Sequence, residues 1–164
     1  MSIPTVVLPD SGPPTPTRAM PACFQTIMRQ LWSLDKTVLA DCGSDCPKNN
    51  DYLVDLTLHY ARGANHSTGI LNAYDDAVDI QWWNMGGATC SPAAPAISQA
   101  DWEAALTQLR QAGKAATNRF DTYYVPSTVH GWLNGNFYST TVNGTKLTDW
   151  TRDLINGSFH DVGP

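Results

Sequence analysis

Acidic and imidazole side chains follow two successive predicted strands in this sequence. Asp75 and Asp76 come directly after the apolar run Thr68–Tyr74, and His130 lies in the loop after the run Phe120–Pro126. In open α/β sheets, functional groups gather where the carboxyl ends of the strands meet the loops. A carboxylate beside an imidazole fixes its tautomer and stabilises the imidazolium, so the imidazole can move a proton between a nucleophile and a leaving group.

Each of these residues also has a simpler interpretation. Taken alone, His130 fits a solvated loop position, and Asp75 or Asp76 fits the N-cap of a helix. Their joint placement at successive strand ends is what supports an acid–base pair. A third interpretation is a metal-dependent hydrolase that uses His130, His59 or His66 together with aspartates, but the histidines lack the paired spacing usual for such ligands. We therefore assign no metal ligand.

The sequence offers no clear nucleophile for this pair. In α/β-hydrolases the chain order is nucleophile, acid, histidine, and the serine lies in a Gly-x-Ser-x-Gly turn between a strand and a helix. The nearest string is Asn65–Gly69, "NHSTG", which lacks the first glycine and leads into a strand. We therefore predict that Ser67 is not a nucleophile and that this chain contains none. Trp132, two residues beyond His130, is the best candidate for an aromatic side chain that faces a substrate.

The elements that would hold these residues follow from hydrophobic periodicity. The predicted strands are Thr5–Pro9, which we expect to be buried, Thr68–Tyr74 and Phe120–Pro126. The first predicted helix is Ala22–Leu34, and the second runs through Leu53 and Tyr60. The third runs from Asp75 to the glycines at 86 and 87, and the fourth begins at a capping box of Ser98 and Asp101. The last helix runs through Leu147 and Leu154 and stops at Gly157. Strands separated by helices predict an α/β fold in which a mostly parallel sheet carries helices on both faces. Residues 1–164 should form a single domain.

Composition excludes several partners. The formal net charge is −5, with no basic stripe that would favour a nucleic acid. The apolar runs are too short to span a bilayer, so we expect no membrane segment. The start "MSIPTVVLPDSGPP" lacks the basic and apolar regions of a signal peptide.

The four cysteines are expected to form disulfides in an exported protein. They are Cys23, Cys42, Cys46 and Cys90. The spacing "CGSDC" could also hold zinc, but a structural zinc site usually needs a second pair at similar spacing. Four thiols allow three pairings, and the sequence does not choose among them.

Three stretches resemble the pectinacetylesterase family of serine esterases. They are "VVLPDSGPP", "ILNAYDDAVDI" and "YYVPSTVHGWL…FYSTTVNGTKLTDWTRDLING", and together the resemblance covers essentially the whole chain. His130 matches the family histidine. The family pattern places a glutamine and an aliphatic residue three and four positions after the acid, and Asp76 fits this spacing with Asp79 and Ile80. Asp75 fits the preceding tyrosine better, so it is the alternative acid.

The resemblance implies a secreted or periplasmic carboxylic-ester hydrolase that uses no cofactor. Its substrate would be a small-molecule or polysaccharide ester, from which it removes acetyl or other acyl groups. In the family the serine turn lies upstream of the segment that resembles "VVLPDSGPP". This chain is therefore expected to be the C-terminal part of an α/β-hydrolase-like protein, a fragment without its nucleophile. The alternative is a non-catalytic binding or interaction module that kept the scaffold and lost the chemistry.

Overall fold

The computed structural model of the chain describes residues 4–47, 51–83, 90 and 97–164. The elements in chain order are β1 (Thr5–Val7), α1 (Ala22–Leu31), the 3-10 turn η1 (Leu34–Lys36), α2 (Val38–Cys42), the 3-10 turn η2 (Gly43–Asp45), α3 (Tyr52–Ala61), β2 (His66–Ala73), α4 (Ala77–Trp83), α5 (Gln99–Ala116), β3 (Phe120–Val125), β4 (Thr141–Val142), β5 (Thr145–Lys146) and α6 (Leu147–Asn156). The predicted α/β class is confirmed: a three-stranded parallel sheet is flanked by helices, and a small antiparallel hairpin is added.

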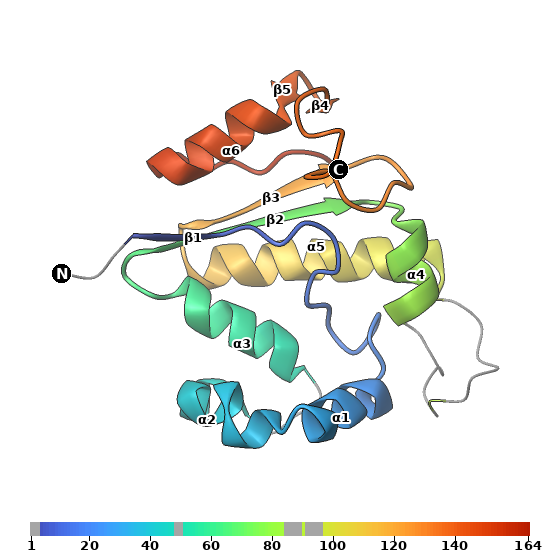
Figure 1. The fold of residues 1–164 in the computed structure, drawn as a ribbon, viewed down its shortest axis with the longest axis vertical. Coiled ribbons are helices and arrows are strands. Elements are labelled where there is room, and N and C mark those ends of the chain that lie inside the picture. Colours follow the sequence, from blue (N-terminus) through green and yellow to red (C-terminus); the bar gives the residue numbers. More distant parts are fainter. Residues whose placement is uncertain (1–3, 48–50, 84–89, 91–96) are drawn as a thin grey trace.

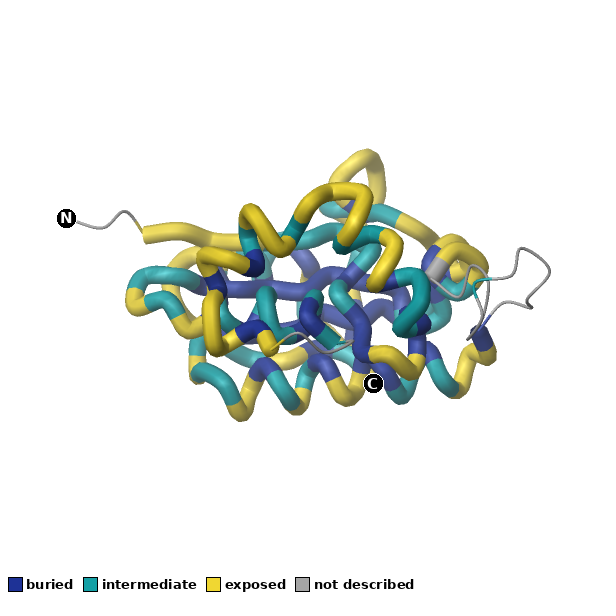
Figure 2. The backbone as a smooth tube through the Cα atoms, turned by 90° about the horizontal axis from the view of Figure 1, so that it is seen from below, coloured by how far each residue is buried: buried dark blue, intermediate teal, exposed yellow. Residues whose placement is uncertain are grey.

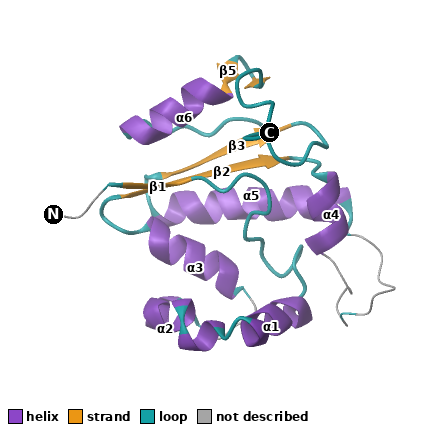
Figure 3. Ribbon diagram, in the orientation of Figure 1, coloured by secondary structure: helices purple, strands orange, loops and turns teal. Residues whose placement is uncertain are grey.

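The strand order is β1-β2-β3, with β2 in the centre. Thr68 lies opposite Phe120 and Ala73 opposite Val125, so β2 and β3 end at the same edge of the sheet. Helix α6 and the β4–β5 hairpin cover one face of the sheet, and α3 and α5 cover the other (Figures 1 and 3). Helices α1 and α2 lie on the far side of α3 from the sheet (Figure 1).

Neighbouring residues of β2 and β3 belong to two separate cores, because successive side chains of a strand point to opposite faces of the sheet. Ile70 and Tyr124 pack with α3 and α5, whereas Leu71 and Tyr123 pack with α6. Every residue of β3 and every residue of β2 after His66 is buried, and Figure 2 shows buried backbone running through the middle of the molecule. Trp102 anchors the first core and Trp150 the second, each with no exposed surface.

The two edges of the sheet differ. The outer edge of β3 is closed by the C-terminal tail, where Val162 N–H donates to Thr122 O at 2.8 Å and Tyr124 N–H donates to Val162 O at 2.9 Å. Within the described residues, β1 pairs with β2 alone. The prediction of a buried first strand is wrong: Val6 is 39% and Val7 44% exposed, and neither belongs to the described cores on the two faces of the sheet.

Local signals mark most helix ends correctly. The Ser98 hydroxyl accepts from the Asp101 N–H at 3.1 Å, which confirms Ser98 as the N-cap of α5, and it donates to the Asp101 carboxylate at 2.7 Å. Gly157 ends α6 with a φ of 79°, the left-handed conformation that glycine adopts without strain. The first predicted helix ends three residues early, at Leu31. The predicted glycine stop at 86 and 87 lies outside the described residues.

All four cysteines form disulfides, as expected, and the pairing is Cys23 with Cys90 and Cys42 with Cys46. The segment around the second bridge was predicted as a loop but contains α2 between two 3-10 turns. This segment belongs to a small third core that contains Leu39, Cys42, Cys46 and Tyr52. Among the helices described, none is both long and apolar enough to cross a bilayer.

Candidate acid–histidine site

The carboxyl ends of β2 and β3 remain hydrogen-bonded after both strands have ended. Tyr74 N–H donates to Val125 O at 2.7 Å, and Asp75 N–H donates to Ser127 O at 3.2 Å. These bonds hold the segment before α4 beside the loop that carries His130. The parallel register of β2 and β3 therefore brings the predicted acid and the predicted histidine to one place.

Asp76 is completely buried at the start of α4. Its Oδ1 accepts N–H bonds from Val78 at 3.0 Å and from Asp79 at 2.9 Å, which satisfies two donors of the first helical turn. This aspartate thus caps the helix and also faces the imidazole. The cap predicted for Asp76 is confirmed, and its role as the acid of a catalytic pair stays a prediction.

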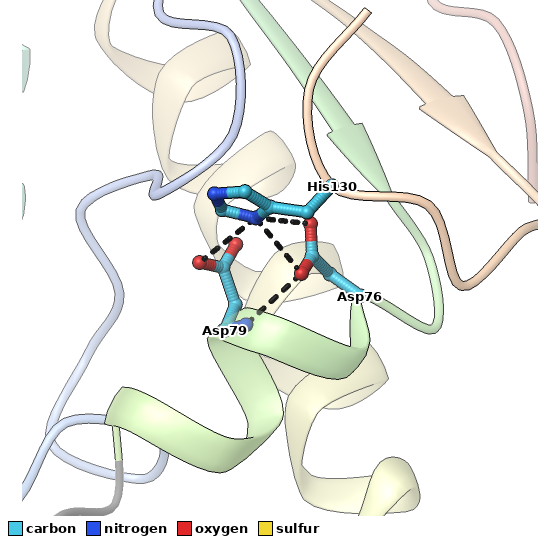
Figure 4. A group of neighbouring side chains, drawn as sticks. All are labelled: Asp76, Asp79 and His130. Carbon is cyan, nitrogen blue, oxygen red and sulfur yellow. Dashed lines mark hydrogen bonds and ion pairs between the residues drawn. The ribbon is translucent and has the colours of Figure 1, made fainter.

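His130 points at Asp76, as Figure 4 shows. Its Nδ1 lies 3.1 Å from each carboxylate oxygen, although the residues are 54 positions apart in the chain. An Nδ1–H bonded to the carboxylate leaves Nε2 as the basic nitrogen. The His130 side chain is 40% exposed, so the ring is anchored on one side and accessible on the other. The choice of Asp76 as its partner agrees with the geometry, whereas Asp75 turns away and accepts from Gln99 Nε2 at 2.6 Å.

Asp79 is a second buried carboxylate at the site, and the sequence analysis assigned it no role. Its Oδ1 lies 3.8 Å from His130 Nδ1, and its Oδ2 accepts from Gly12 N–H at 3.0 Å. Burial and the negative charge of Asp76 raise the pKa of Asp79 to about 6, against smaller opposite effects of Gly12, His130 and the Asn72 side chain. The three-residue spacing from Asp76 was the available signal, because residues at i and i+3 of a helix share a face.

Asp76, Asp79 and His130 offer ligand atoms within 4.8 Å of one another, so we considered a metal site. Several of these atoms already have partners. Asp76 Oδ1 accepts two backbone N–H groups, and Asp79 Oδ2 accepts a third. A cation would also have to replace the proton on His130 Nδ1. The arrangement fits a hydrogen-bonded imidazole better than a metal centre.

Two other residues singled out from the sequence lie elsewhere. Trp132 is only 2% exposed and packs in the core under α6, so its expected role as a substrate-facing aromatic is not supported. The chain turns at Gly131, whose φ is 83°, and this turn directs the following indole inward. Ser67 is buried near the opposite end of β2 from the site, about 20 Å away at about 3.3 Å per residue.

Comparison with family models, with curated proteins and with solved structures found no match to this chain. The chemical interpretation of the site therefore rests on the residues themselves. Their geometry provides a buried acid, an oriented imidazole and an accessible basic nitrogen.

Proposed function

We propose that these 164 residues supply the acid and the base of a serine carboxylic-ester hydrolase, as the pectinacetylesterase resemblance implies. The observation that carries the proposal is the bond from His130 Nδ1 to the buried carboxylate of Asp76, 3.1 Å from each oxygen. This is the arrangement by which an aspartate orients a catalytic histidine. The nucleophilic serine belongs to a segment outside this sequence.

In the proposed reaction, His130 Nε2 accepts the serine proton while the serine oxygen attacks the acyl carbon. The imidazolium, stabilised by Asp76, then donates the proton to the departing alcohol, and an acyl-enzyme remains. A water molecule gives its proton to Nε2 and attacks the acyl carbon. The carboxylic acid leaves, and the serine recovers its proton from the imidazolium. No cofactor takes part.

The substrate class comes from the resemblance: an acetyl or other acyl ester of a carbohydrate or related alcohol. The two disulfides support a compartment that is oxidising, and we propose that the complete protein is secreted or periplasmic. The net charge of −5 argues against a nucleic acid as the partner.

The test is to restore the nucleophile. The genomic sequence upstream of Met1 would be read for an in-frame Gly-x-Ser-x-Gly segment, and the joined protein assayed on nitrophenyl acetate. We expect hydrolysis that is lost in His130→Ala and falls about 10⁴-fold in kcat in Asp76→Asn, which leaves the imidazole in the wrong tautomer. Asp75→Asn is the matched control and should keep full activity. Equal rates in the joined protein and in its His130→Ala variant would refute the proposal.

A non-catalytic binding module is the second candidate. It is favoured by the exposed strand β1, since an unpaired apolar edge is a typical site for association with another chain. A joined protein that binds acylated carbohydrate but hydrolyses no ester would support this candidate over the first.

A further inference from the structure

The segment after β1 lies against the site although it precedes His130 by about 120 residues. Beyond Val7 the chain keeps following β2, where Leu71 N–H donates to Pro9 O at 3.1 Å and Ser11 N–H donates to Leu71 O at 3.0 Å. These two bonds carry Asp10, Ser11 and Gly12 alongside the last residues of β2. The segment thus reaches the edge of the sheet where α4 and the His130 loop meet.

Asp10 and Ser11 bind the backbone of the residues that follow His130. The Asp10 carboxylate accepts from Trp132 N–H at 3.0 Å and 2.9 Å and from Leu133 N–H at 2.8 Å. The Ser11 hydroxyl oxygen accepts from Gly131 N–H at 2.9 Å. Three consecutive backbone donors are therefore held by two adjacent side chains, and the bonds to the carboxylate are charge-assisted.

The same segment also holds the acidic side of the site. Gly12 N–H donates to Asp79 Oδ2, so residues 10–12 connect the His130 loop to α4. Ser11 has a φ of 68° and Gly12 a φ of 71°. The left-handed conformation is unfavourable for a serine, and a residue keeps it only where surrounding contacts hold it there. Here the imposing contacts are those to the His130 loop and to Asp79.

We propose that Asp10 and Ser11 are positioning residues for His130. Residues 127–140 contain no helix or strand, so the orientation of the imidazole depends on what fixes this loop. Asp76 holds one ring nitrogen, and the Asp10–Ser11 pair holds the backbone that carries the ring. The catalytic meaning of this inference rests on the proposed function, but the anchoring itself is a property of the chain alone.

The first experiment uses the 164-residue chain and nuclear magnetic resonance. In the unchanged chain we expect one imidazole tautomer, with the proton on Nδ1, and slow exchange of the amides of Trp132 and Leu133. Asp10→Ala should speed exchange of these two amides by about tenfold or more and give a mixture of tautomers, while amides of β2 and β3 keep their protection. Asp10→Asn keeps one acceptor oxygen, so it should retain part of the amide protection and part of the preference for one tautomer.

Asp75→Asn serves as the matched control, because it removes a charge near the same edge and its side chain bonds Gln99, while its backbone bond to the His130 loop is kept. It should change neither signal. An Asp10→Ala chain that keeps a single tautomer, or that loses amide protection uniformly, would overturn the proposal. Uniform loss would mean that Asp10 stabilises the whole fold rather than the loop.

The second experiment measures kcat and KM in the joined protein. Asp10→Ala should lower kcat by about 100-fold with little change in KM, because a displaced base loses rate rather than substrate affinity. Ser11→Ala should give a smaller loss, and a complete loss would overturn its positioning role and make it a candidate nucleophile. If the joined protein is inactive while Asp10→Ala shows the expected resonance changes, the proposed function fails and the anchoring stands. If the joined protein is active and Asp10→Ala leaves its kcat and KM unchanged, the positioning role of Asp10 is overturned.

Discussion

Asp79 makes the stability of this protein depend on pH in an unusual direction. Its pKa is about 6 in the folded chain and 3.8 in a model carboxyl group, because it is buried and faces Asp76. Between these two values the unfolded chain has released the proton while the folded chain still binds it. The contribution of Asp79 to stability is therefore greatest below about pH 4, declines as the pH rises, and is constant above about pH 6.

The size of the effect follows from the difference between the two values. A pKa about 2 units higher in the folded state destabilises the fold by about 3 kcal/mol at neutral pH, at about 1.4 kcal/mol per unit. Asp79→Asn removes the charge and keeps an oxygen that can accept the Gly12 N–H. We expect this variant to be more stable by about 2–3 kcal/mol at about pH 7.5, and by well under 1 kcal/mol at about pH 4.

Urea unfolding followed by tryptophan fluorescence at the two pH values measures this difference. A gain of about 3 kcal/mol corresponds to a rise of about 6–12 °C in melting temperature for a chain of this size. Asp75→Asn, at a partly exposed neighbour, is the control and should not reproduce the gain in stability at about pH 7.5. The reasoning is refuted if Asp79→Asn destabilises the protein at about pH 7.5, or if its effect is the same at both.

Two further outcomes are expected from the same protein. Replacing Cys23 and Cys90 by alanine, which opens a loop of 67 residues, should lower the unfolding free energy by about 4 kcal/mol in urea titrations. The Cys42 and Cys46 pair, with a separation of 4, should cost about 2 kcal/mol, and equal losses would contradict the loop-length argument. In a nitrophenyl acetate assay the unmodified chain should not exceed an imidazole control; robust turnover that Ser67→Ala abolishes would show that the nucleophile was wrongly excluded.

The acid–histidine pair was predictable because it depends on regular elements. Short apolar runs marked β2 and β3, and the helices between them implied parallel pairing, so residues after the two strands had to meet. The spacing of Asp79 and Ile80 behind Asp76 then favoured that acid over its neighbour. Because the strands pair in a regular way, the positions of residues in the sequence after each strand predict where they lie in space.

The remaining features depend on contacts that no local pattern encodes. Asp10 and Ser11 have the composition of an ordinary turn, and their bonds to the His130 loop join residues more than 100 positions apart. The direction of Trp132 is set by one backbone angle at Gly131 and by the space beneath α6. The exposure of β1 could not be foreseen either, because it depends on which strands lie beside it.

The unequal edges of the sheet limit how copies of this chain could assemble. Within the described three-stranded sheet, Val162 pairs along the outer edge of β3, whereas no further strand follows β1 on its other side. Strand-by-strand growth into a filament needs two free edges per copy. Association through β1 alone would therefore terminate at a pair of chains, because the occupied edge of β3 cannot extend the same sheet further.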